Sequence, residues 1–263
     1  MIILEKQLQD ECAEVEEAGK DQTEAANNAM DDAPPPAYST HVQHTSSSGS
    51  TEFQPPSKPT NFLSLVLKDK PIRGCYVIDP RMEIPLNLLP PLNTGETDQE
   101  RKNLFLRTKD GSIDADIWLV GQEEATPRSG RRTTLSLSSD DGSITAKINT
   151  VKVIAPFLLD IYSRDGRVTV LLPRSFHGSL LLTTRQSTKL SDDLMQQSTM
   201  LSTVEHTRRY FVGDTGDVSH RLFGNDWNGD ELKVVSRDGR IIIRYKDEAE
   251  LPKFGFFSRI FSS

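Results

Sequence analysis

Four aspartates in this 263-residue sequence are each followed by glycine, and this repetition is the first feature that could support chemistry. They are Asp110, Asp141, Asp165 and Asp238. Repeated Asp-Gly turns bind calcium in β-rolls, but those repeats need a Gly-Gly-x-Gly-x-Asp frame that this sequence lacks. A basic residue also precedes the aspartate in three copies, at Lys109, Arg164 and Arg237. The pattern therefore predicts turns, and we expect no metal and no cofactor.

A pair of carboxylates could support hydrolysis of a glycosidic bond. Asp114 and Asp116 are two residues apart, so they point to the same face of a strand. Glycoside hydrolases use two carboxylates at a defined separation. This leaves open an enzyme that acts on polysaccharide, although a solvated pair is the simpler interpretation. The isolated Cys12 and Cys75, and a turn-like His177, complete no nucleophile or metal motif. We therefore expect no catalytic residues.

A recognition element stands near the N-terminus, at Pro35-Pro36-Ala37-Tyr38. Consecutive prolines pre-form a polyproline II helix, which binds aromatic-lined grooves at low entropic cost. The Pro-Pro-x-Tyr pattern resembles ligands of WW domains, in which Pro35 and Pro36 would lie across the groove and Tyr38 would fill the next pocket. WW domains occur in ubiquitin ligases, so such an enzyme is the expected class of partner. An idle proline-rich linker is the alternative.

The charge of the chain is concentrated in residues 1–60. This segment has eleven acidic residues against three lysines, which gives −8, and the total of −7 leaves +1 for residues 61–263. We expect residues 1–60 to be a disordered acidic tail rich in proline and serine, with a short helix at 2–19. Neither part has the basic stripe that nucleic-acid binding needs. Without a signal peptide or an apolar membrane span, the sequence predicts a cytoplasmic protein.

Residues 61–247 read as an all-β repeat domain. Apolar residues alternate on both sides of each Asp-Gly, as in Leu135 and Leu137 before the turn and Ile144 and Ala146 after it. Asp-Gly is the usual centre of a two-residue hairpin. From Asp110 the copies follow at intervals of 31, 24 and 21 residues, the last being the degenerate Gln186, and Asp238 comes 52 residues later. Such periods favour a short β-solenoid or roll in which each coil adds one rung. A β-sandwich of hairpins is the alternative.

Three further segments carry a family resemblance together with the repeats. They are Tyr76-Val77-Ile78-Asp79-Pro80, Asp116-Ile117-Trp118-Leu119-Val120 and Leu172-Pro173-Arg174-Ser175-Phe176-His177-Gly178. With the repeats they resemble a fungal family of domain-of-unknown-function proteins (7330-type) with Ser-Lys-Asp-Gly-Ser-Ile copies. The repeat style is also similar to adhesin-like β-solenoids of bacteria. The resemblance implies the fold and brings no activity or catalytic residue with it.

Residues 248–263 form an aromatic C-terminal tail, whose apolar residues include Phe254, Phe256, Phe257 and Phe261. We expect them to cap an open end of the sheet, or else to make a weak contact with a partner or a membrane surface. The sequence as a whole predicts a non-enzymatic binding or scaffold protein whose tail is recognised by a WW domain. The alternative is an adhesin-like or carbohydrate-interacting solenoid, with hydrolysis as one of its activities.

Overall fold

A computed structural model of the chain describes residues 56–92, 95–121, 132–214 and 229–248. Several predictions made above fall outside these ranges: the helix at 2–19, the Pro35–Tyr38 motif and the phenylalanines from Phe254 to Phe261. The described part is built almost entirely of β-strands, which confirms the all-β class. Within it, no helix has the length and apolar character that a membrane span requires.

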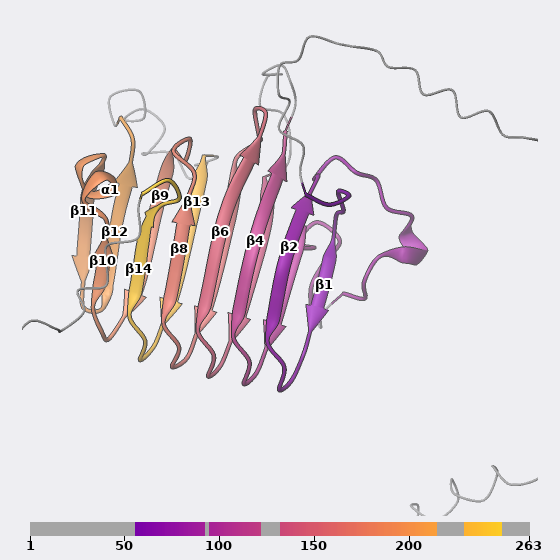
Figure 1. The fold of residues 1–263 in the computed structure, drawn as a ribbon, viewed down its shortest axis with the longest axis horizontal. Coiled ribbons are helices and arrows are strands. Elements are labelled where there is room, and N and C mark those ends of the chain that lie inside the picture. The colour runs from indigo at the N-terminus through magenta and orange to yellow at the C-terminus, as the bar shows by residue number, and fades with distance from the viewer. Residues whose placement is uncertain (1–55, 93–94, 122–131, 215–228, 249–263) are drawn as a thin grey trace, which may run out of the picture. The chain divides into compact units, whose positions relative to one another are not determined.

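The strands form two sheets, which we call the long sheet and the short sheet (Figure 1). The long sheet has the order β1 (Leu63–Val66), β3 (Leu104–Thr108), β5 (Thr133–Ser139), β7 (Phe157–Ser163), β13 (Asp230–Ser236), β9 (Gly178–Thr184), β12 (Thr207–Val212) and β11 (Ser198–Val204). The short sheet has the order β10 (Thr188–Leu190), β14 (Ile241–Tyr245), β8 (Val168–Leu172), β6 (Ile144–Val151), β4 (Ile113–Val120) and β2 (Ile72–Ile78). A 3₁₀ helix, η1 (Leu86–Leu88), and one α-helix, α1 (Asp192–Gln196), complete the described elements.

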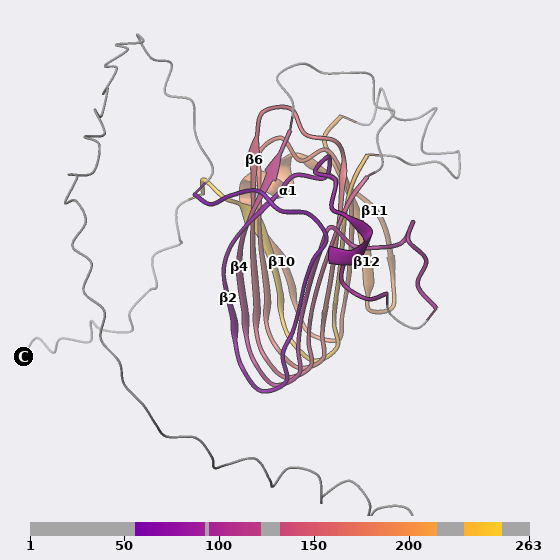
Figure 2. The same ribbon diagram turned by 90° about the vertical axis from the view of Figure 1, so that its right-hand side faces the viewer.

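Strands joined by an Asp-Gly turn lie in different sheets and do not pair with each other, so these turns do not close the hairpins of the alternative prediction. For example, β5 precedes the turn at Asp141 and pairs in parallel with β3 and β7, whereas β6 follows it and pairs in parallel with β4 and β8. Each turn therefore carries the chain from one sheet to the other, and one strand from each sheet makes a rung. Figure 2 looks along the stack, where the rungs lie behind one another with their turns at one edge.

The rungs do not stack in chain order, although the sequence predicts that each coil adds the next rung to the stack. The last rung, β13 and β14, stands between the β7–β8 rung and the β9–β10 rung. β13 pairs in parallel with β7 on one side and with β9 on the other. In the short sheet β14 lies likewise between β8 and β10 (Figure 1). The chain completes β9 to β12 and then returns to insert its final rung.

Rows of matched apolar side chains fill the space between the sheets. One row of the long sheet joins five leucines in register: Leu104, Leu135, Leu159, Leu232 and Leu180. All five are less than 2% exposed. Full burial of such a side chain stabilises the fold by about 1.5–3 kcal/mol. The alternation seen in the sequence thus has its predicted consequence, with one face in the core and one outside.

Hydroxyl groups connect the stacked turns. The buried Ser139 Oγ donates to Gly111 O of the preceding turn at 2.8 Å and accepts from Gly142 N of its own turn at 2.9 Å. Thr108 makes the equivalent bonds one rung earlier, to Lys70 O at 3.0 Å and from Gly111 N at 3.2 Å. The small polar residue two positions before the aspartate therefore connects one rung to the next at Thr108, Ser139 and Ser236, whereas the Ser163 hydroxyl bonds within its own turn.

Candidate functional site

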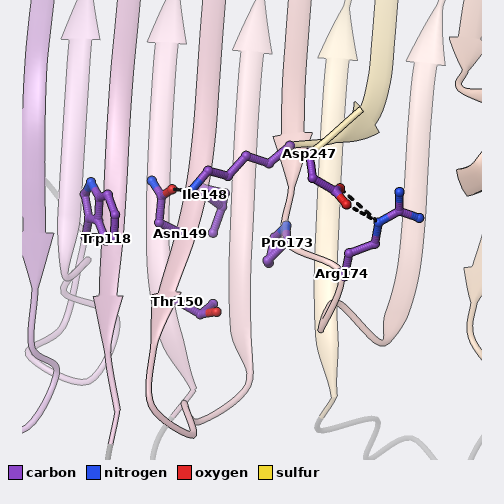
Figure 3. Close-up of a pocket in the computed structure, with 8 residues that line it drawn as sticks. Trp118, Ile148, Asn149, Thr150, Pro173, Arg174 and Asp247 are labelled. Atoms are coloured by element: carbon purple, nitrogen blue, oxygen red, sulfur yellow. Dashed lines mark hydrogen bonds and ion pairs between the residues drawn. The ribbon is translucent and has the colours of Figure 1, made fainter. Parts of the chain in front are cut away.

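A cavity of about 390 Å³ lies on the outer face of the short sheet, where β4, β6 and β8 end (Figure 3). Its lining residues are Trp118, Ile148, Asn149, Thr150, Pro173, Arg174, Lys246 and Asp247. They come from four successive rungs, so the stacking of strands far apart in the sequence creates the cavity. Its size falls in the range of small-molecule sites, which combine apolar walls with a few placed polar groups.

Two side chains that line the cavity are buried although they lie on the outer face of the short sheet. Trp118 on β4 is 8% exposed and Asn149 on β6 is 2% exposed. The two residues are in register, directly beside one another in the sheet. A buried amide must have partners for its donors and acceptor, so the surroundings of Asn149 determine what this site can do.

The Asn149 amide is held on both sides. Its Nδ2 donates to the Asp116 carboxylate and, at 3.2 Å, to Ile117 O. Its Oδ1 accepts from Lys246 Nζ, the contact that the dashed line at Asn149 marks in Figure 3. The Lys246 ammonium also lies 5.1 Å from the centre of the Trp118 ring, a cation–π distance. These contacts use the hydrogen-bonding capacity of the Asn149 amide and fix Lys246 against the aromatic wall.

Arg174 forms the opposite wall of the cavity and contacts two carboxylates and an aromatic ring. Its Nε lies 2.9 Å from the carboxylate of Asp247, and a terminal nitrogen lies 2.8 Å from Asp193 of α1. The guanidinium group is 4.3 Å from the centre of the Tyr245 ring. Tyr245 itself is fully buried, and desolvation raises the pKa of its hydroxyl above the usual value. Arg174 thus links two carboxylates and covers the end of the core.

The arrangement suits binding better than covalent chemistry. Arg174 is paired with two carboxylates, and Lys246 donates to the neutral amide of Asn149. The Cys75 thiol, next to Asp116 in register, has its pKa raised by burial and then by that carboxylate. A thiol with a raised pKa is a poor nucleophile. The cavity therefore offers a shaped surface on which the Asn149 amide and the Arg174 guanidinium group already have partners.

Asp114 and Asp116 do face outward as predicted from the sequence, Asp114 exposed and Asp116 partly buried. Asp116 is in register with Cys75 and Lys147, and Asp114 with Arg73 and Thr145. Neither therefore has a carboxylate directly beside it on a neighbouring rung. Asp116 lies 3.6 Å from Lys147 Nζ and contacts Asn149, so its charge is used within the sheet.

The turn edge brings the repeated aspartates into a column in which they interact with basic residues and with one another. Arg164 contacts Asp141 of the preceding rung and lies 3.1 Å from Asp165 of its own turn. Hydrogen bonding to Arg164 lowers the pKa of Asp141. Desolvation, followed by the nearby acids, raises the pKa of Asp110 instead. Across the described ranges, no group of three or more His, Cys, Asp or Glu side chains is arranged to hold a metal ion.

The described residues do not test the binding elements named from the sequence. Pro35, Pro36 and Tyr38 lie outside the described residues, as do the C-terminal phenylalanines. His177 stands between β8 and β9, where its ring packs edge-on against Phe211 at a centroid distance of 5.3 Å. Sequence reasoning missed Trp118, Asn149 and Lys246 as a set. Only the register between β4, β6 and the end of β14 brings them together, and no short sequence motif contains all three.

Comparison with known proteins gives a family and no relative of known activity. A family model described as "Domain of unknown function (DUF7330)" matches residues 61–248. No curated protein matches the chain. No solved structure matches it either.

Proposed function

The chain belongs to this DUF7330 family of domains of unknown function, and we propose that it is a non-enzymatic binding and scaffold protein. The observation that carries the proposal is that polar side chains around the cavity are paired with one another. The Asn149 amide has its partners, Arg174 is shared between Asp247 and Asp193, and Asp116 is used by its neighbours. Catalysis needs groups whose charge or proton is available to the substrate.

Two features of the architecture support a scaffold role. Parallel rungs with connected turns give a stiff frame, since buried hydroxyls such as those of Thr108 and Ser139 bond one turn to the turn of the neighbouring rung. The frame also presents broad outer faces, whose side chains contribute little to the core. A protein of this kind positions partners, and the partner has to be recruited by a recognition element.

We assign recruitment to Pro35-Pro36-Ala37-Tyr38, which fits the Pro-Pro-x-Tyr pattern of WW-domain ligands. A WW domain of a ubiquitin ligase is the proposed partner. The C-terminal phenylalanines from Phe254 to Phe261 would supply a weaker second contact. The motif precedes the family domain at 61–248, so recruitment through it leaves the stacked rungs intact.

The test measures binding of the full-length protein to an isolated WW domain by calorimetry. Tyr38→Ala is expected to weaken binding at least tenfold, because the tyrosine pocket is left empty. The matched control changes Pro55 and Pro56 to alanine, since that pair lacks a tyrosine two residues later. Equal affinity of the wild type and Tyr38→Ala would end the WW proposal. Turnover of a polysaccharide by the purified protein would end the non-enzymatic one.

A further inference from the structure

The four outermost strands of the two sheets differ in how their open edges are protected. Natural proteins blunt sheet edges with short strands, charged residues or covering segments, because an open edge can pair with another chain. β1 has only four residues and continues into Lys68. β2 carries Arg73, and Thr60 bridges to its last residue. β10 has three residues, includes Lys189 and leads into α1.

β11 is neither short nor charged. It runs for seven residues, Ser-Thr-Met-Leu-Ser-Thr-Val, without a charge, a proline or a glycine. In the long sheet its one described neighbour is β12, with which it pairs antiparallel (Figure 1). Short uncharged segments of high β-propensity at an exposed edge are the usual sites of strand addition.

Apolar side chains are exposed along and beside this edge. Met200 is 55% exposed, Leu201 is 44% exposed and Val204 is 66% exposed. Met195 on the adjacent α1 is 46% exposed. An edge that offers hydrogen-bonding backbone and apolar side chains together can gain from both when another strand covers it.

The irregularity of β11 selects its partner. The register with β12 shifts between Met200 and Ser202, so Leu201 is an extra residue at the middle of the strand. Such a bulge divides the edge into two regular stretches and works against pairing with an ordinary extended peptide. A second β11 related by a twofold axis at Leu201 has its bulge at the same place. The two uncharged strands would then match along their length without like-charge repulsion.

We propose that β11 is the interface of a homodimer, in which two copies of this chain pair antiparallel through Ser198–Val204 and join their long sheets. Leu201 of each copy lies at the twofold axis. Met195 and Met200 flank it and are covered by the second copy. The dimer would continue the sheet at the end opposite β1, and it leaves the cavity beside Trp118 and the turn edge accessible.

Sedimentation velocity of the full-length protein over a wide concentration range tests this proposal. The mass of the wild type is expected to rise from 29.4 kDa toward twice that value. Leu201→Lys places two like charges at the axis and should keep the protein monomeric. Val66→Lys is the matched control, because Val66 is 61% exposed on β1, the opposite edge strand of the same sheet. It should dimerise like the wild type.

A cross-link gives an independent measurement that does not depend on a destabilising charge. In a chain with Cys12 and Cys75 changed to serine, Leu201→Cys should form a disulfide between two copies under mild oxidation, whereas Val66→Cys should not. A wild type that stays at 29.4 kDa at all concentrations overturns the proposal. So does a Leu201→Lys protein that is folded by circular dichroism and dimerises as the wild type does.

Discussion

The carboxylate of Asp230 accepts a hydrogen bond from the main-chain N–H of His177 at 3.0 Å, although the two residues are 53 positions apart. The other carboxylate oxygen accepts from the N–H of Phe157 at 3.1 Å. Phe157 begins β7, His177 precedes β9, and Asp230 begins the strand between them. One side chain therefore fixes the inserted rung to both of its neighbours at the point where all three strands start.

Asp230→Ala is expected to lower the free energy of unfolding by about 1.5–3 kcal/mol, the usual contribution of hydrogen bonds to a charged group. Both backbone donors would lose their acceptor at once. Urea denaturation measures the change. Asp247→Ala is the control, because that carboxylate has an exposed ion pair with Arg174, and exposed pairs contribute about 0–1 kcal/mol. Equal effects of the two substitutions would contradict the role of Asp230.

Engineered disulfides can verify the order of the rungs. Tyr162 on β7 is in register with Val235 on β13, which is in register with Thr183 on β9. Neighbouring strands are about 4.8 Å apart, and next-nearest strands are about twice that. A disulfide needs Cα atoms roughly 4.4–6.8 Å apart. We therefore expect a cross-link in Tyr162→Cys/Val235→Cys and none in Tyr162→Cys/Thr183→Cys, with both native cysteines changed to serine.

Mass spectrometry of the non-reduced protein reads out both pairs. If the rungs followed chain order, β7 and β9 would be neighbours and the second pair would form the bond. The two double variants thus distinguish the inserted arrangement from the sequential one within a single experiment, and each serves as the control of the other.

The sequence predicts the rungs well and their order poorly. The alternation of Leu135 and Leu137 identifies a core face, and the serine or threonine two positions before each Asp-Gly aspartate marks the turn. The rung order depends on which strand packs beside β7. β9 offers inward Leu180 and Leu182, and β13 offers inward Leu232 and Val234. The two sets are chemically alike, so local pattern cannot decide between them, and only contacts such as those of Asp230 do.

The sequence kept a sandwich of hairpins as an alternative for a related reason. Asp-Gly favours the backbone angles of a tight turn, but it does not determine whether the two strands pair with each other or with separate sheets. Long-range parallel pairing decided the outcome. The cavity was missed because its residues are far apart in the sequence. Trp118 and Asn149 become neighbours only through the register between β4 and β6, and Lys246 reaches them from a rung that stacks out of chain order.

The glycines of the stacked turns should tolerate no side chain. A Cβ at Gly142 would lie 1.8 Å from Gly111 O of the preceding turn, which is backbone and cannot move aside without separating the rungs. Gly142→Ala is expected to cost about 1–3 kcal/mol, as overpacking does. At Gly74 a Cβ would meet nothing closer than 3.4 Å, so Gly74→Ala should be neutral or stabilise by up to about 1 kcal/mol. Thermal unfolding of both variants checks the contrast, and an equal loss in both would refute it.

Stability should fall at high pH through Tyr245. Desolvation raises the pKa of its buried hydroxyl, which donates to Gln197 Oε1 at 2.6 Å. In the unfolded chain a tyrosine ionises near pH 10, at about its ordinary pKa. As the pH rises past that value, the unfolded state loses its proton first, so the contribution of Tyr245 is complete below it and is lost as the pH approaches the folded pKa. The difference in unfolding free energy between wild type and Tyr245→Phe should therefore shrink as the pH rises above 10. Tyr162→Phe, on an exposed side chain, is the control for the general effect of alkali. A difference for Tyr245→Phe that stays constant with pH would show that the buried hydroxyl ionises as readily in the folded protein as in the unfolded chain.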